Sequence, residues 1–584
     1  MASAVTAKKE KMMVAAIDFG TTYSGYAFSL KTDYNADPTK ISINQGWVAG
    51  SMAVSSYKAP TVVLFDQKGE FNSFGYEAED AYSELALDNE HHDWYYFSRF
   101  KMRLHHENNQ KIHRDMDLQD DKGRKLPAIT VFGKVIWYLK DHMLKALKKR
   151  GTEMKNEDIH WIITVPAIWA DSAKQFMREA AYKADIAGSQ LTIALEPEAA
   201  SLYCQYLPTE KIHGTAGLTF DVASTGSKYM VIDLGGGTAD ITVHERHSGG
   251  GLREVHKASG GAWGGTRVDE AFKQMLIKII GAPVLDKFCE EHRADYLYLQ
   301  RELEVKKRTM KPSTSGKITL KVPVNLREAY TKETGESIED AIKGSPYAGK
   351  LVWHSDKIRL DATIFKGLFK DCIDKIVEHI RDLLNHPEVK GTDLMLMVGG
   401  FSESEMMHDA IENAFKKCRV IIPEDAGLCV MKGAVIFGHR PVAITSRVSR
   451  YTYGINISPP FDPNSHPESH KVTIGGRDRC QNVFKSYIRE GESIRVGEER
   501  SGRHITLNTH QTEMLLNIFA SPKKTPQFVD EPEVELLGQV VVQLPDRDEL
   551  IKVEVKMIFG ETELHVEAQE MSTNNKYTSF FDFL

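Results

Sequence analysis

Hydrophobic and polar positions follow two different patterns along this chain. Up to about residue 440, short apolar runs alternate with stretches whose apolar residues recur at helical spacing, as in 135–150. Residues 161–165 and 394–398 form short continuous apolar runs, which are typical of buried strands. Strands that alternate with helices predict a mixed α/β unit.

Beyond about residue 441 the helical spacing fades, and short β-prone runs are separated by polar breaks. These runs are 451–457, 481–488, 513–520, 538–543, 551–559 and 563–568. They predict an all-β sandwich, and because no helical pattern follows them we expect no helical lid. The expected organisation is a loose tail (1–13), an α/β unit (14–440), a linker (441–450) and a sandwich (451–584).

A glycine hairpin is predicted in the middle of the α/β unit. Residues 231–243 contain an apolar strand ending near Asp233, the triplet Gly235–Gly237, Thr238 and a second β-prone run. Glycines remove every Cβ from such a turn, so backbone N–H groups can converge on an anion, and the Thr238 hydroxyl adds a donor. Asp233 is suited to hold hydrated Mg²⁺ against a phosphate.

The same pattern occurs near the N-terminus, in residues 14–28. Asp18 and Gly20 match Asp233 and Gly235, and two threonines, Thr21 and Thr22, stand near the place of Thr238. Two such hairpins about two hundred residues apart indicate an internal duplication. Two phosphate loops facing each other across a cleft would hold one triphosphate and one metal ion.

Two further residues, Glu196 and Lys101, would belong to the site if that cleft exists. Glu196 precedes a proline at a predicted strand-to-helix corner, where it could orient water or metal. Lys101 lies in an aromatic and basic segment and is otherwise interpreted as a solvated surface residue. Asp171 is predicted to cap a helix that runs to Gly188.

Composition narrows the function classes. The net charge of −7 gives no reason to expect nucleic acid, and no apolar run approaches the roughly 20 residues of a membrane helix. The first 13 residues lack the apolar core of a signal peptide. The six cysteines are scattered without a Cys-x-x-Cys pair, which favours reduced thiols, no zinc site and a cytoplasmic or nuclear location.

Five motifs in one order carry a resemblance to a known family. They are Asp18-Phe-Gly-Thr-Thr-Tyr23, Ile163-Thr-Val-Pro166, Glu196-Pro-x-Ala-Ala200, Asp233-Leu-Gly-Gly-Gly-Thr238 and Val398-Gly-Gly400. Together they resemble the signatures of the 70-kDa heat-shock chaperone family, in the family's order and spacing. The segment 17–26, with Phe-Lys-Met at 100–102, looks most like an atypical branch of that family. The likeness over 451–584 rests mainly on strand spacing.

The resemblance implies an actin-like, two-lobed ATPase domain (a duplicated ribonuclease H-like fold) that binds ATP or ADP and Mg²⁺. It implies that Lys101, Glu196 and Asp240 are catalytic and that Asp18 and Asp233 hold water-bound Mg²⁺. The nucleotide-binding residues that it implies are Gly20, Thr21, Thr22, Tyr23, Gly235, Gly236, Gly237, Thr238, Gly264, Gly265, Glu304, Lys307, Arg308, Gly399 and Gly400.

The resemblance also implies partners: unfolded or extended peptides or folded client proteins, with co-chaperones or nucleotide-exchange factors. This sequence departs from the family at Phe401 and Lys311, where serine is usual, and at the linker. The missing lid predicts either a weak, fast-exchanging peptide site or a site remade for folded partners. Two alternatives stay open: a metabolite kinase on the same fold, and a nucleotide-dependent scaffold, signalling or filament protein with little hydrolysis.

Overall fold

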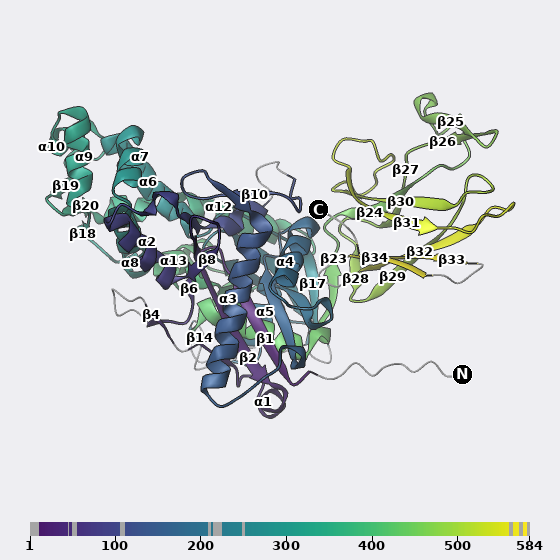
Figure 1. Cartoon of the computed structure of the whole chain (residues 1–584), viewed down its shortest axis with the longest axis horizontal. Helices are drawn as coiled ribbons and strands as arrows, with labels where there is room; N and C mark the ends of the chain where they lie inside the picture. The colour runs from purple at the N-terminus through teal and green to yellow at the C-terminus, as the bar shows by residue number, and fades with distance from the viewer. Residues whose placement is uncertain are drawn as a thin grey trace.

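A computed structural model describes most of the chain (Figure 1). The described residues are 11–44, 46–48, 55–105, 111–207, 212–213, 225–247, 251–559, 564–571 and 576–580. No helix among them is long and apolar enough to cross a membrane.

The first half of the α/β unit is built on a sheet around β1 (Met13–Phe19). β1 is antiparallel to β2 (Tyr23–Leu30) and parallel to β12 (Ile159–Val165), which is parallel to β13 (Leu191–Leu195). β3 (Ser42–Ile43) and β6 (Ala59–Pro60) pair with the far side of β2. β1 is buried along its whole length because helices cover both faces of the sheet.

The second half repeats this strand order. β15 (Lys228–Leu234) is antiparallel to β16 (Ala239–Arg246) and parallel to β21 (Leu394–Val398), which is parallel to β22 (Arg419–Pro423). β16 pairs in turn with β17 (Leu252–Gly261). The matching order confirms the predicted duplication.

Two helices lie between the duplicated sheets. α5 (Glu196–Cys204) and α14 (Cys429–His439) share one hydrophobic core with residues from both sheets. At their crossing, a Cβ on Gly433 would come 1.7 Å from the Ala199 carbonyl oxygen, so only glycine allows this contact. The two halves therefore meet on a tightly packed pair of helices.

The remaining elements of the α/β unit include the outer helices and two small three-stranded sheets. In the first half they are α2 (Tyr76–Leu87), α3 (Ala128–Lys149), α4 (Asp171–Lys183), β7 (Val62–Phe65), β8 (Phe71–Phe74) and β9 (Tyr95–Ser98). In the second half they are α6 (Thr266–Ile280), α7 (Ala282–Glu291), α8 (Arg293–Thr309), β18 (Lys317–Lys321), α9 (Val324–Thr334), α10 (Ile338–Gly344), β19 (Leu351–His354), β20 (Lys357–Asp361), α11 (Ala362–Gly367), α12 (Lys370–Asn385) and α13 (Glu405–Ala414). The helical spacing over 135–150 corresponds to α3.

The C-terminal part lies at one end of the molecule and is built on two four-stranded antiparallel sheets, beside a small sheet of β25 (Lys471–Ile474) and β26 (Arg477–Cys480) (Figure 1). One contains β24 (Thr452–Ile457), β27 (Val483–Ile488), β30 (Glu513–Ser521) and β31 (Glu535–Gln543). The other contains β29 (Glu498–Ile505), β32 (Lys552–Phe559), β33 (His565–Glu570) and β34 (Lys576–Phe580). Their apolar faces share one core, and the described part of 451–580 contains no α-helix.

The predicted linker is an ordered strand. Within 441–450, β23 (Ile444–Val448) pairs in parallel with β17, and β28 (Ser493–Arg495) pairs with β23. The second sheet therefore extends into the C-terminal part, while the position of a domain boundary stays a prediction.

One local prediction is wrong. The helix that begins at Asp171 ends at Lys183, well before Gly188, and the Asp171 side chain makes no capping bond. Its carboxylate instead accepts a hydrogen bond from the Tyr453 hydroxyl at 2.9 Å and pairs with Lys174 at 3.1 Å. A contact 282 residues away in sequence thus overrides the local capping pattern.

Candidate functional site

The turns of the two predicted hairpins lie at the same cavity of about 500 Å³. Predicted site residues that line it are Asp18, Gly20, Thr21, Thr22, Tyr23, Lys101, Glu196, Asp233, Gly235, Gly236, Gly237, Thr238, Gly265, Glu304, Lys307, Arg308, Gly399 and Gly400. Of the predicted set, Asp240 and Gly264 do not line the cavity and lie behind it. The structure therefore brings together residues that are nearly 400 positions apart.

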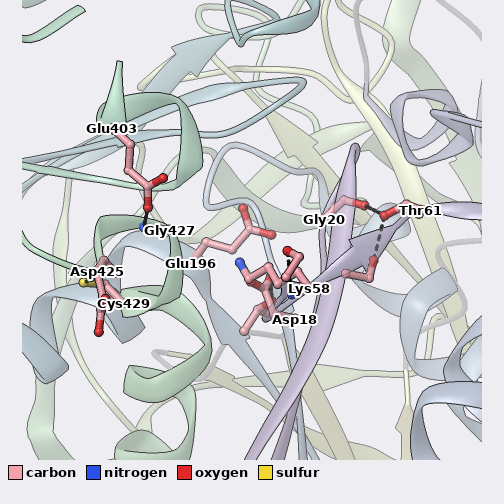
Figure 2. A network of polar contacts seen from close by, with 12 residues as sticks. Asp18, Gly20, Lys58, Thr61, Glu196, Glu403, Asp425, Gly427 and Cys429 are labelled. Atoms are coloured by element: carbon pink, nitrogen blue, oxygen red, sulfur yellow. Dashed lines mark hydrogen bonds and ion pairs between the residues drawn. The ribbon is translucent and has the colours of Figure 1, made fainter. Parts of the chain in front are cut away.

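The two turns touch across the cavity. A Cβ on Gly236 would come 2.2 Å from Thr22 Oγ1, and one on Gly237 would come 2.6 Å from Thr21 Oγ1. Neither contact leaves room for a further side chain, so these glycines let the backbone of the second turn approach the threonine side chains of the first turn. On the other side, the Thr61 hydroxyl donates to the Gly20 carbonyl at 2.8 Å and holds the first turn (Figure 2).

A third glycine loop supports the second turn from behind. The N–H groups of Gly264, Gly265 and Thr266 donate to the carbonyls of Gly237, Gly235 and Gly236 at 3.1, 3.1 and 2.8 Å. A Cβ on Gly264 would come 2.6 Å from the Gly235 carbonyl oxygen. Gly264 therefore supports the turn and Gly265 reaches the cavity.

The equivalent carboxylates Asp18 and Asp233 have different surroundings. Asp18 Oδ1 accepts from the Thr164 hydroxyl at 2.9 Å, and Asp18 Oδ2 accepts from Lys58 Nζ at 2.6 Å. Asp233 Oδ2 is buried and has no hydrogen-bond partner among the described residues. Burial raises the pKa of Asp233 well above its ordinary value, because a charged carboxylate loses its hydration there.

Lys101 and Glu196 form an ion pair inside the cavity. Lys101 Nζ lies 2.8 Å from Glu196 Oε1 and 5.1 Å from the centre of the Trp169 ring. Lys101 is only 2% exposed, which excludes the solvated-surface interpretation. Burial raises the pKa of Glu196 to about 7, although Lys101 opposes the shift. This carboxyl group can therefore exchange a proton near neutral pH.

Asp240 lies one step behind this pair. It stands opposite Asp233 on the paired strands β15 and β16, and its Oδ1 accepts from the backbone N–H of Ile168 at 3.0 Å. Burial raises the pKa of Asp240 as well. Asp240 thus connects the second hairpin to the segment that follows β12.

The charged face of α8 forms the opposite wall. Lys307 pairs with Asp269 at 2.8 Å and with Glu304 at 2.6 Å, while Arg308 pairs with Glu304 at 2.7 Å and lies over the Tyr23 ring. Burial alone would raise the pKa of Glu304, but Lys307 and Arg308 lower it to about 2. This wall combines cations with an aromatic ring.

The floor beneath that wall is the loop after β21. Gly399 has a φ of +85°, and a Cβ there would come 2.3 Å from Asp233 Oδ1, whereas Gly400 faces open space. Phe401, where the resembling family has serine, is buried and stacks on Phe369 with ring centres 6.3 Å apart. Lys311 pairs with Glu405 at 2.6 Å and does not line the cavity.

The residues fit a hydrated cation better than a directly bound one. The unpartnered Asp233 oxygen is suited to accept from a metal-bound water, and Mg²⁺ retains several waters in proteins. Among the described residues, no cluster of three or more His, Cys, Asp or Glu side chains could hold a metal directly.

Several cavity residues were not anticipated from the sequence. They are Ser56, Tyr57, Lys58, Glu403, Ser404, Asp425, Gly427, Leu428 and Val430. Glu403 Oε1 accepts a hydrogen bond from the Gly427 N–H at 3.0 Å (Figure 2). Because Glu403 closely follows the Gly399-Gly400 motif along the chain, its place near the cavity could have been expected from that motif. Lys58 lies in no motif, and nothing in the sequence marks it.

A second cavity of about 500 Å³ adjoins the first. It lies between α2 of the first half and α6 and α8 of the second half. The lining residues that it shares with the first cavity are Thr21, Thr22, Tyr23, Ser56, Glu304 and Arg308. Three of its carboxylates are held in ion pairs: Glu79 with Arg301, and Asp269 and Glu304 with Lys307.

Known proteins are similar to this chain over nearly its whole length. The family described as Hsp70 protein matches residues 88–338. Heat shock 70 kDa protein 12A of Mus musculus is 34% identical over 100% of this chain and 93% of its own length. Heat shock 70 kDa protein 12B of Homo sapiens is 33% identical over 98% of this chain and 91% of its own length. Chaperone protein DnaK of Thermosipho melanesiensis is 26% identical over 71% of this chain and 56% of its own length.

Proposed function

Since this chain belongs to the Hsp70 family, we propose that it binds ATP and ADP with Mg²⁺ in the cavity between the two hairpins and hydrolyses ATP slowly. The observation that carries this proposal is the meeting of two glycine–threonine turns at a cavity that also holds the buried Lys101–Glu196 pair. Backbone N–H groups and threonine hydroxyls are the donors that polyphosphates require.

Phosphoryl transfer to water depends on positioning and on neutralising charge. Mg²⁺, when bound, would neutralise phosphate charge, and Asp18 and Asp233 are the residues that would hold its waters. Lys101 would stabilise charge on the terminal phosphate. Glu196, with a pKa of about 7, would orient the attacking water and accept its proton. Glu304, Lys307 and Arg308, together with Gly399 and Gly400, would enclose the nucleoside.

The C-terminal sheets supply the second half of the proposed function. They would bind extended peptides, or folded client proteins, under control of the bound nucleotide. The described part of 451–580 contains no α-helix to close over a peptide, so peptide release should be fast and should depend little on the bound nucleotide. Co-chaperones or nucleotide-exchange factors remain part of this proposal.

The ATPase is favoured over a metabolite kinase. A kinase needs a base aimed at a substrate hydroxyl. Of the four carboxylates that line the adjoining cavity, Glu79, Asp269 and Glu304 are ion-paired, and Glu270 accepts a hydrogen bond from Gln274 at 2.8 Å. A scaffold with little hydrolysis would not need the buried Lys101–Glu196 pair, which is costly to maintain in the apo protein.

One set of measurements separates these functions. Nucleotide binding is measured by titration calorimetry and ATP turnover by phosphate release, with unfolded peptides or a panel of sugars added. ADP binding with slow turnover supports the proposal, and sugar-dependent ATP consumption would indicate the kinase. Binding without turnover would indicate the scaffold. Peptide dissociation that accelerates by orders of magnitude when ATP replaces ADP would contradict the weak coupling proposed for these sheets.

A further inference from the structure

Lys58 reaches the nucleotide cavity from a segment that carries none of the sequence motifs. It lies between β5 (Ser55–Ser56) and β6, and its Nζ donates to Asp18 Oδ2 at 2.6 Å (Figure 2). Its stem crosses β2 at Gly25, where a Cβ would come 3.0 Å from Lys58 Cγ. The side chain is only 16% exposed, so its position is determined by packing as well as by charge.

The charges around Lys58 explain what it could do. The negative charges of Asp18, Asp233 and Glu196 all favour the charged form of its ammonium group, and all three residues line the cavity. Three carboxylates at this place would repel the phosphates of a nucleotide unless a cation stood between them. Lys101 is paired with Glu196, which leaves Lys58 to neutralise Asp18.

We propose that Lys58 is a tethered cation of the nucleotide site, which neutralises Asp18 and donates to the phosphates, so that ADP and ATP bind with little dependence on Mg²⁺. An ammonium group carries three N–H donors, and the contacts of the described residues use one of them for Asp18. The others are available to phosphate oxygens, as charge-assisted hydrogen bonds. The inference rests on the proposed nucleotide function.

The duplication provides an internal comparison for this role. Asp233 holds the place of Asp18 in the second half, yet its Oδ2 has no partner among the described residues. A metal-bound water would therefore find a free acceptor at Asp233 and a lysine in competition at Asp18. Lys58 thus determines how much of the positive charge near the phosphates comes from the protein and how much comes from the metal ion.

The test measures ADP affinity by calorimetry in Mg²⁺ and in EDTA. We expect EDTA to weaken ADP binding to the wild-type chain by less than about tenfold, and to weaken binding to Lys58→Met by about 100-fold or more. Lys40→Met is the matched control, because it removes an ion pair of the same 2.6 Å length, to Asp33, outside the cavity. It should behave as the wild type.

A second readout does not depend on nucleotide. Binding of Mn²⁺ to the protein alone, followed by electron paramagnetic resonance, should become at least about tenfold tighter in Lys58→Met, because Asp18 is released as an acceptor. Lys58→Arg retains the positive charge and should leave Mn²⁺ binding weak.

The outcomes distinguish this inference from the proposed function. A wild-type chain that loses ADP binding by about 100-fold or more in EDTA overturns the inference, whether or not Lys58→Met folds. Equal EDTA sensitivity in the wild type and in Lys58→Met overturns it too, and so does unchanged Mn²⁺ affinity. No ADP binding under any condition would instead refute the proposed nucleotide function.

Discussion

Asp18 and Asp233 hold the same position in the two halves of the α/β unit, and their surroundings differ. Each ends a strand before a glycine turn, and each strand has an antiparallel and a parallel neighbour in the same order. Asp18 is paired with Lys58, whereas Asp233 keeps an unpartnered oxygen among the described residues. Duplication of the backbone has therefore preserved the turns and not the charges around them.

The halves also divide the chemistry. Each half supplies one glycine turn, but Lys58, Lys101 and Glu196 come from the first half, and the α8 wall with Lys307 and Arg308 comes from the second half. Only the second sheet is extended by β23 and β28 toward the C-terminal part. The first half thus supplies the cations that pair with Asp18 and Glu196, and the second half supplies the cations of the α8 wall.

The largest expected effect comes from removing a first-half cation. Lys101→Ala should lower single-turnover ATP hydrolysis by roughly 10²–10³-fold and leave ADP affinity nearly unchanged, because a buried charge aimed at the transition state is lost. Arg103→Ala, on the exposed side of the same short helix, is the control. Equal hydrolysis rates in the two variants would refute the role of Lys101.

The extension of the second sheet depends on an ion pair that joins the halves. Arg447 of β23 binds Glu198 of α5 through two hydrogen bonds of 2.7 Å, and the Glu198 side chain is 3% exposed. Arg447→Met should lower the free energy of unfolding, measured by urea denaturation, by about 3 kcal/mol, since it leaves a buried carboxylate unpaired.

Arg500→Met is the matched control for that variant. It breaks partly exposed pairs with Glu492 and Glu498, which together should cost about 1 kcal/mol or less. Hydrogen exchange of residues 444–448 reports whether β23 opens. Unfolding free energies that fall equally in both variants would show that the Arg447 pair contributes no more than a surface pair.

The two aspartates themselves should respond unequally. Asp233→Asn should raise the Mg²⁺ concentration that gives half-maximal ATP turnover by about tenfold, because it removes a free acceptor for metal-bound water. Asp18→Asn should raise it by less, because Lys58 already occupies that carboxylate. Magnesium titrations of the two variants check this, and equal shifts would remove the distinction between the halves.

The smallest expected effect is a pH dependence. Burial raises the pKa of Glu196 to about 7. Its carboxylate form therefore becomes populated as the pH rises through 7, and not at the lower pH where an ordinary glutamate ionises. If the carboxylate accepts the proton of water, turnover should increase about fourfold between pH 6.5 and 8. Glu196→Gln should abolish that increase. A flat wild-type profile would show that Glu196 does not titrate during turnover.

Much of the site could be predicted from local sequence. The strand, Asp, glycine and hydroxyl pattern at 14–28 and at 231–243 requires a tight turn wherever it folds, because its conformation depends on residues that are adjacent in the chain. Because this pattern occurs twice, the sequence also indicates the duplication of the α/β unit. The strand runs beyond 450 could be predicted for a similar reason: alternation of side chains is a local property.

Tertiary structure decided the contacts between distant segments. Lys58 reaches Asp18 only because β6 pairs with β2, and no local pattern encodes that reach. Asp171 binds Tyr453 instead of capping its helix, and the expected linker became β23 because the edge of β17 was open to pairing. Charges and strand edges find partners through space, so the sequence determined the turns and strands, and packing determined which charges meet in the site.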